Sequence, residues 1–285
     1  MRFFFLLLCY NLSELVSGQV IQQDHSLHPQ KKITQYVIEK WDKNEGLPGN
    51  AIENIIQSNE GYIWVVGFNG LIRFDGFDFH TYNSSNTPAI TSNNIYDIKI
   101  DQQGNFYMAL HKGGVVKYSN GKFENLCPDG NFPHVVQCLW LDRKSEKIWL
   151  GTRERGVFYI ENRRFLPIQN DILKNVTVSQ MTQDSLNGLW IGTENIGLVY
   201  YQDGKISIWD KLDNKEVRRI NSVYLSKKNE LLVGTEYGLC QLSNEKLVLI
   251  KELKGVLVND IIEDTYGCWW MATNSGLVRK NTFTN

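Results

Sequence analysis

The chain has 285 residues, of which 42% are apolar, and a formal net charge of -1 at pH 7. This is an ordinary globular composition, so the chain is long enough to bury a sizeable core and is not expected to be disordered. The even balance of 30 basic and 31 acidic residues gives no sign of the concentrated basic face of a nucleic-acid-binding protein, and we expect no nucleic-acid partner.

The first 18 residues have the pattern of a signal peptide. Arg2 supplies a positive charge, residues 3–10 (FFFLLLCY) form a short apolar run, and residues 16–18 (VSG) form a cleavage site. The run is far shorter than the roughly 20 residues that span a bilayer, so we expect export without a transmembrane helix. Cys9 lacks the small residues that precede a lipidated cysteine, which favours cleavage over lipidation. A lead-in of residues 19–33 then precedes a domain of residues 34–285.

One motif recurs about every 42 residues through that domain. Residues 61–76 read GYIWVVGFNGLIRFDG, and related stretches begin at Gly104, Lys147, Gly188, Glu230 and Gly267. The spacings between successive anchor positions are 43, 42, 41, 42 and 38 residues, for Trp64, Tyr107, Trp149, Trp190, Leu232 and Trp270. Six copies at a fixed period indicate a repeat architecture.

Each repeat predicts four short strands. In the first copy these are residues 50–57, 62–67, 71–74 and 77–82. Asp75-Gly76 predicts a two-residue type I′ hairpin turn, which needs positive φ at both positions. Asn120-Gly121 and Asp203-Gly204 repeat this signal, with weaker forms at Asn162-Arg163 and Asn244-Glu245.

Four-stranded units joined by short turns, without helical periodicity, predict an all-β fold, a β-propeller of six four-stranded blades. The last repeat has three expected strands, whereas residues 34–41 (TQYVIEKW) form an expected strand without a blade. We expect this N-terminal strand to complete the sixth blade and close the ring, which would remove two exposed strand edges.

The repeated tryptophans and glycines have structural explanations. A tryptophan present on the second strand of most blades serves packing between blades, and the recurrent glycines mark turns. Cys127, Cys138, Cys240 and Cys268 fit no metal motif, and the histidines have no metal-ligand spacing. We therefore expect no metal and no cofactor. Buried thiols are favoured, although export would permit one disulfide.

The repeat resembles the two-component regulator propeller family. The resemblance is carried by GLPGN at residues 46–50, the W-[IVL]-G-T core, the following G-[LV] and the trailing [DN]-G turn, and it covers about residues 34–280. It implies the periplasmic sensor region of bacterial hybrid histidine kinases and related receptors, whose members detect carbohydrate breakdown products. It also implies an oligosaccharide or other small-molecule ligand and a signalling kinase or cyclase domain, in cis or in trans.

The loops between second and third strands are the candidate ligand site. In a propeller they gather at one end, together with the segments that enter the inner strands. We expect ligand-binding groups there because these loops differ from blade to blade on a rigid scaffold. The candidates are Asn69, His111, Lys112, Arg153, Arg155, Glu194, Asn195, Glu236, Tyr237 and Asn274.

Two alternatives remain open. A freestanding propeller could serve binding or assembly without a signalling output. A propeller glycosidase or lyase could use a carboxylate pair among Glu154, Glu194 and Glu236, although repeat equivalence explains these residues more simply. We expect the module itself not to be an enzyme.

Overall fold

The computed structural model describes residues 31–36, 39–49, 51–127, 132, 134–142, 144–145 and 147–282. The predicted signal peptide, Cys9 and most of the lead-in lie outside the described residues, so these predictions stay as they are. No helix in the described ranges is long and apolar enough to cross a membrane.

Six small, mainly antiparallel sheets form the molecule. The first contains β1 (Ile52–Gln57), β2 (Ile63–Gly67), β3 (Gly70–Phe74) and β4 (Phe79–Tyr82). The second contains β5 (Ile95–Ile100), β6 (Phe106–Leu110), β7 (Val115–Ser119) and β8 (Lys122–Asn125). The third contains β9 (Val136–Leu141), β10 (Ile148–Thr152), β11 (Val157–Glu161) and β12 (Arg164–Pro167). The fourth is β13 (Val178–Gln183), β14 (Leu189–Thr193), β15 (Leu198–Gln202) and β16 (Lys205–Trp209).

The fifth and sixth sheets depart from four strands. The fifth contains β19 (Ile220–Leu225), β20 (Leu231–Thr235), β21 (Gly238–Ser243) and β22 (Lys246–Leu249), extended outward by a small hairpin of β17 (Lys211–Leu212) and β18 (Lys215–Glu216). The sixth has three strands within the described residues: β23 (Val258–Glu263), β24 (Trp269–Thr273) and β25 (Gly276–Lys280).

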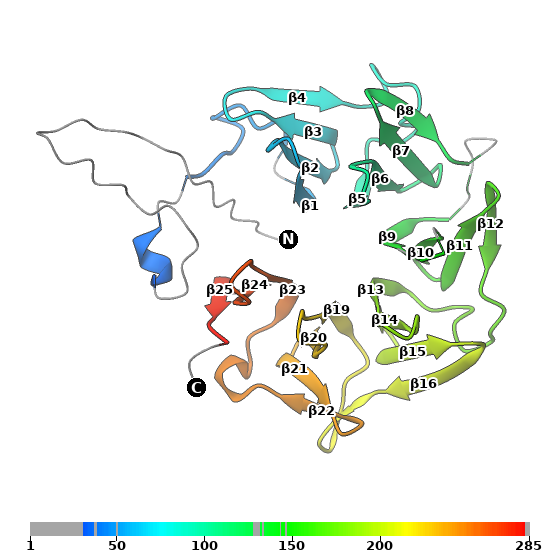
Figure 1. The fold of residues 1–285 in the computed structure, drawn as a ribbon, viewed down its shortest axis with the longest axis vertical. Helices are drawn as coiled ribbons and strands as arrows, with labels where there is room; N and C mark the ends of the chain where they lie inside the picture. The colour runs from blue at the N-terminus through cyan, green and yellow to red at the C-terminus, as the bar shows by residue number, and fades with distance from the viewer. Residues whose placement is uncertain are drawn as a thin grey trace, which may run out of the picture.

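The sheets stand around a common axis as blades, with β1, β5, β9, β13, β19 and β23 innermost (Figure 1). The predicted six-bladed propeller is confirmed. Each inner strand has a register irregularity two residues after its start, as between Ile95 and Asp97 of β5. Such a bulge bends the strand and redirects the side chain that follows it.

The repeated aromatic residues pack between blades, as expected from their period. Trp64 of the first blade is 2% exposed and contacts Phe106 and Tyr118 of the second, at ring-centroid distances of 4.9 and 5.5 Å. Trp149 and Trp190 likewise lie against the cores of the blades that follow them. The structural explanation of these tryptophans is sufficient.

Most predicted hairpin turns have the expected backbone, with one exception. Both turn residues have positive φ at Asn120-Gly121 and Asp203-Gly204. The Asp75-Gly76 prediction of a two-residue turn is wrong, because β3 ends at Phe74 and β4 begins at Phe79. The Asp75 carboxylate accepts hydrogen bonds from the backbone N–H groups of Phe77 and Asp78, at 3.0 and 2.8 Å, and so stabilises a longer turn. Phe77 is left 87% exposed at its tip.

The predicted N-terminal strand does not form in the described residues. Ile33–Gln35 is instead a 3₁₀ turn, in which the Gln35 side chain accepts a hydrogen bond from the Lys32 N–H at 2.6 Å. The Gln35 N–H donates within the same turn, to the Lys32 carbonyl at 2.9 Å, so it is not available to a neighbouring strand. Val37 and Ile38 lie outside the described residues.

The N-terminal segment nevertheless contacts both blades that flank the ring closure. Tyr36 lies edge-on to Trp270 of the sixth blade, with ring centroids 6.1 Å apart, and its hydroxyl bonds to the Arg279 guanidinium at 3.0 Å. Trp41 packs on Phe74 of the first blade, with ring centroids 5.3 Å apart. Residues 31–49 therefore link the sixth blade to the first through side chains.

The contact between the sixth and first blades, which we call the seam, differs from the other blade contacts. In the described part of the chain, successive inner strands pack side by side from β1 to β23, but β23 and β1 do not (Figure 1). Ile262 of β23 is 59% exposed, whereas Tyr224, at the same position of β19, packs against the following blade. The seam thus relies on the N-terminal segment.

All four described cysteines are buried free thiols: Cys127, Cys138, Cys240 and Cys268. The structure therefore has no disulfide between them. Burial raises the pKa of the Cys240 thiol to about 11, with a smaller contribution from the Asp213 carboxylate.

Candidate functional site: the loop face

The end of the propeller that carries the turns between second and third strands is here called the loop face. In the third to sixth blades these turns are fixed by the threonine of the W-[IVL]-G-T core, whereas the first two blades have Gly67 and Leu110 at that position. The hydroxyls of Thr152 and Thr193 donate to the carbonyls of Gly156 and Gly197, both at 2.6 Å. Thr235 and Thr273 bond in the same way to Gly238 and Gly276. The threonine of the repeat motif thus stabilises this turn through a hydrogen bond.

Backbone hydrogen bonds then tie each turn to its surroundings. The first loop residue bonds to the segment that enters the inner strand of its own blade, as from His111 N–H to the Asn94 carbonyl at 2.9 Å. The turn glycine bonds to the next blade, as from Gly197 N–H to the Arg218 carbonyl at 2.8 Å. The loops therefore lie beside the entering segments, as expected, on a rigid frame.

Four side chains from the first three blades meet on this frame. Phe68, 45% exposed, lies edge-on to Tyr96, with ring centroids 6.3 Å apart. The Tyr96 hydroxyl is 3.2 Å from His111 Nδ1, and the Arg153 guanidinium carbon lies 5.8 Å from the centre of the Tyr96 ring. We call Phe68, Tyr96, His111 and Arg153 the aromatic–cation cluster.

Further basic groups surround this cluster. Burial lowers the pKa of His111, and the nearby charges of Lys112 and Arg153 lower it further. Burial and the charge of Arg155 lower the pKa of His134 in the same way. Both imidazoles are therefore favoured in the neutral form near pH 7, each beside a fixed positive charge.

The remaining predicted residues lie apart from the cluster. Glu194 is 3.7 Å from the Arg219 guanidinium in an exposed ion pair, and Arg219 also bonds to Asn221 at 3.2 Å. Tyr237 is half-buried in the core of the fifth blade, with the Lys215 ammonium 5.7 Å from its ring centre. The Asn69 side chain donates to the Pro48 carbonyl. Asn195, Glu236 and Asn274 are exposed on their own loops.

Sequence reasoning thus selected His111 and Arg153 but missed their central partner. Tyr96 lies on an inner strand, where the alternating pattern predicts a core residue. The bulge after Ile95 redirects the chain at that point, and only the structure shows that Tyr96 reaches the loop turns. Phe68 lies in the predicted loop next to Asn69, but only Asn69 was selected as a candidate. An exposed aromatic residue in such a loop is a stronger indication of ligand binding than an asparagine.

The propeller axis is occupied by a polar network. Lys99 lies 3.2 Å from the Asp97 carboxylate, and Gln180 of the fourth blade bonds to Asp260 of the sixth at 3.2 Å. Asn54 donates to Asp97, whose other oxygen accepts the Leu139 N–H at 2.8 Å. Burial alone would lower the pKa of Lys99, but Asp97 and Asp260 outweigh it and raise the pKa. We assign this network a structural role, in which it closes the propeller axis.

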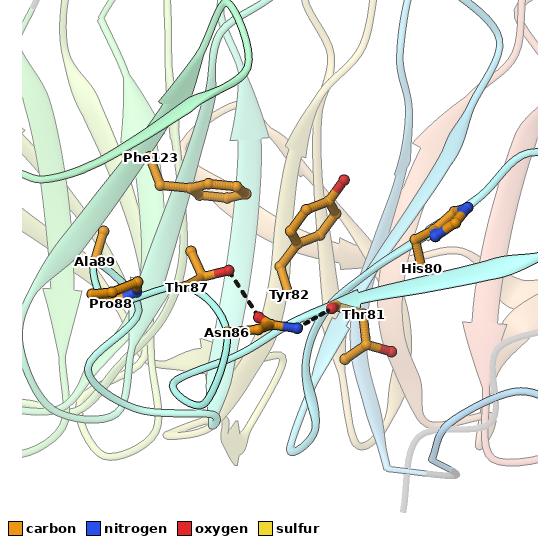
Figure 2. A pocket seen from close by; sticks show the side chains of 8 residues that line it. All are labelled: His80, Thr81, Tyr82, Asn86, Thr87, Pro88, Ala89 and Phe123. Atoms are coloured by element: carbon orange, nitrogen blue, oxygen red, sulfur yellow. Dashed lines mark hydrogen bonds between the residues drawn. The ribbon is translucent and has the colours of Figure 1, made fainter.

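A depression of about 630 Å³ lies at the outer rim, between β4 and β8 (Figure 2). Tyr82 and Phe123 line it, but its polar groups already bond to one another. Asn86 donates to the Thr81 carbonyl at 2.8 Å and accepts from the Thr87 hydroxyl at 2.9 Å (Figure 2). Few polar groups remain for a ligand, so the loop face is the better candidate. Within the described ranges no cluster of His, Cys, Asp and Glu could hold a metal ion.

Comparisons with known proteins agree with the propeller fold. The family model described as two component regulator propeller matches residues 172–195, which include β13 and β14 of the fourth blade. The comparison with curated protein sequences gives no match.

Several solved structures share the fold. One is the extracellular domain of a hybrid two component system of B. thetaiotaomicron, with 22% identity over 84% of this chain and 33% of that one, at a TM-score of 0.69. PorZ, a surface component of the type-IX secretion system of Porphyromonas gingivalis, has 14% identity over 83% of this chain and 41% of its own, at a TM-score of 0.64.

A third is virginiamycin B lyase from Staphylococcus aureus, with 12% identity over 82% of this chain and 85% of its own, at a TM-score of 0.63. These identities support the shared fold and no more. The chain spans less than half the length of the first two structures. Its repeated turn motif agrees with the family match, which identifies residues 172–195 as a two component regulator propeller repeat.

Proposed function

We propose that this chain is the ligand-sensing module of an exported, two-component-type signalling protein, and that the module itself is not catalytic. The family match and the extracellular two-component domains among the similar structures support this assignment. Its output would come from a kinase or cyclase domain, in cis or in trans. The same similarity supports an extracellular or periplasmic location.

The proposed ligand is an oligosaccharide bound at the aromatic–cation cluster. The observation that carries this proposal is Phe68, an exposed aromatic ring held beside Tyr96, His111 and Arg153 on a rigid loop face. A sugar ring presents an apolar C–H face that packs on an aromatic ring, and its hydroxyls bond to polar groups at the edges. The cluster provides both kinds of contact.

The test is a binding screen with soluble oligosaccharides, followed by isothermal titration calorimetry of the best binder. We expect Phe68→Ala to weaken binding by at least about tenfold, because one aromatic stacking contact contributes more than 1 kcal/mol. Phe77→Ala is the matched control, since Phe77 is also exposed but lies on a turn at the other end of its blade. Equal affinities of both variants would contradict the placement of the site.

Absence of catalysis is tested separately. The chain shares its fold with a lyase, and Glu194 and Glu236 lie on loop-face turns. We expect no product from polysaccharides or oligosaccharides with the unaltered protein. Turnover that disappears in Glu194→Gln or Glu236→Gln would instead support the enzyme alternative. The assembly alternative predicts no saccharide binding and a protein partner on the propeller.

A further inference from the structure

We infer that the ligand of the loop face is an acidic saccharide, whose carboxylate binds Arg153 in the aromatic–cation cluster. This inference rests on the proposed function and deepens it, because an oligosaccharide sensor could equally well take a neutral sugar. Three features of the structure support a carboxylate.

The first feature is the uneven distribution of charge over the loop face. The turns of the second and third blades carry Lys112, Arg153 and Arg155 with one carboxylate, Glu154, and His111 and His134 lie beside them. The turns of the fourth and fifth blades carry Glu194 and Glu236 instead. The overall charge of the chain is close to zero. The positive charge is therefore concentrated locally, around the cluster with the exposed aromatic ring.

The second feature is the absence of internal counter-charges. Among the described residues, Arg163, Arg218, Arg219 and Arg279 each form an ion pair with a carboxylate. No such pair is formed by Arg153, Arg155, Arg73 or Arg164 in the same ranges, and of these four only Arg153 and Arg155 are exposed on the loop face. Glu154 lies between them, exposed, in a turn with φ of 60°. The two guanidiniums thus remain available to an external anion.

The third feature is the way Arg153 is held. Its guanidinium lies over the Tyr96 ring, which is itself fixed by Phe68 and His111. A guanidinium that lies near an aromatic ring keeps its planar set of N–H donors for a carboxylate, which it can bind through two parallel hydrogen bonds. Positions for a sugar ring and for its carboxylate are therefore adjacent.

The simpler explanation is that Lys112, Arg153 and Arg155 are ordinary solvated cations on exposed loops. That explanation predicts weak attraction of any polyanion, little dependence on which arginine is removed, and no contribution from Phe68. A built site predicts a requirement for Arg153, for the carboxylate and for the aromatic ring together. The experiment separates these outcomes.

The experiment uses the full chain and two matched series of probes: α-1,4-linked galacturonate oligomers of two to five units, and the same oligomers as methyl esters. The esters keep the sugar rings and hydroxyls but lack the negative charge. Binding is measured by calorimetry at two salt concentrations. A panel of other acidic and neutral oligosaccharides is measured in parallel, so that the result does not depend on one sugar.

We expect at least one acidic oligomer to bind at least about tenfold more tightly than its neutral counterpart. Arg153→Ala should remove that preference, and Arg153→Lys should restore it only in part, because lysine cannot bind a carboxylate through two parallel bonds. Arg164→Ala is the matched control, since Arg164 is exposed on the outer strand β12 of the same blade.

Other results would overturn the inference in distinguishable ways. If neutral oligosaccharides bind as tightly as acidic ones and Phe68→Ala still removes binding, the inference fails but the proposed function stands. If acidic probes bind equally to the unaltered protein, Arg153→Ala and Phe68→Ala, only non-specific attraction exists and the inference fails. If no saccharide of the panel binds, both the inference and the proposed ligand class fail.

Discussion

Individual side chains of this propeller serve either the frame or the loop face. Thr193 is fully buried and bonds to the Gly197 carbonyl, and it has equivalents in three other blades, so it belongs to the frame. Tyr96 has no such equivalents: the other inner strands carry Glu53, Gln137, Ser179, Asn221 and Asn259 at its position. Residues that break the repeat are therefore the ones to test for binding.

Cys240 gives a prediction at this scale, on the dependence of stability on pH. Its folded-state pKa is about 11, against an ordinary value of 9.0, because burial disfavours the thiolate. A raised pKa means that the stabilisation is fully present below the unfolded pKa and is lost as the pH rises through the folded one. We therefore expect the wild-type protein to lose more stability between pH 8 and 11 than Cys240→Ala, by about 2 kcal/mol.

The measurement is urea unfolding of both proteins at several pH values. Other groups that titrate in this range, Tyr200 among them, contribute to both proteins and cancel in the difference. A stability difference that does not change with pH would contradict the assignment. Native Cys240 should also resist thiol reagents at pH 8 until the protein unfolds, because only the thiolate reacts and a pKa of about 11 leaves about a thousandth of it ionised.

At the scale of strands and turns, two kinds of glycine differ in what surrounds them. Gly197 has φ of +90°, and a Cβ there would lie 2.5 Å from the Trp209 carbonyl oxygen. Gly204 has φ of +81° in its hairpin, but nothing lies within 4 Å of the corresponding position. The first glycine is needed for space and backbone conformation, the second for conformation alone.

We expect Gly204→Ala to cost about 1 kcal/mol of unfolding free energy, the usual penalty for a left-handed conformation. Gly197→Ala should cost at least about 3 kcal/mol, because the outer strand must also move. Thermal and urea unfolding of the two variants give the comparison. Similar costs at both sites would show that the turn beside Trp209 yields more easily than its geometry implies.

Most strands could be predicted at this scale because each repeat has the same pattern. The period located the blades, and the Asn-Gly and Asp-Gly pairs located two hairpins with the correct backbone. The failures have local causes. The Asp75 side chain stabilises a longer turn that its pair with Gly76 does not reveal. Gln35 closes a 3₁₀ turn within an otherwise strand-like sequence.

The candidate site was less predictable than the fold. The repeat pattern predicts that the turns between second and third strands lie at one end of the propeller. The location of His111 and Arg153 therefore followed from the repeat. Their convergence on Tyr96 did not, because it depends on the bulge and on contacts across three blades. Tyr237 illustrates the same limit, because the sequence placed it on a loop and only the structure shows that its half-buried ring also packs against the core of the fifth blade.

At the scale of the whole molecule, the seam is held by two aromatic contacts of the N-terminal segment. Tyr36 covers Trp270 on one side, and Trp41 covers Phe74 on the other. The buried pair of Arg279 and Asp264 supports the first contact, with 3.6 Å between the charged groups. Local stability should therefore depend on this segment most strongly in the sixth and first blades.

We expect the double variant Tyr36→Ala/Trp41→Ala to increase amide hydrogen exchange in β24, β25, β2 and β3, while β10 and β14 keep their protection. Each truncation removes a partly covered aromatic ring, at a cost of about 2 kcal/mol. Exchange measured by mass spectrometry resolves these strands, and Phe77→Ala is the exposed control. A uniform change around the ring would show that closure does not depend on the N-terminal segment.

The seam also determines how small movements add up. In an uninterrupted ring, a tilt between two blades is opposed by all the others, because the circle must still close. Here, within the described residues, five packed contacts between inner strands lie in series from β1 to β23, and these two strands are linked through contacts of the N-terminal segment. A slight rotation at each contact, too small to disturb its core, accumulates around the arc and changes the separation of β1 and β23. The distance across the seam is thus the quantity most sensitive to the shape of the whole propeller, and a pair of spectroscopic labels placed there would report rearrangements in blades that neither label touches.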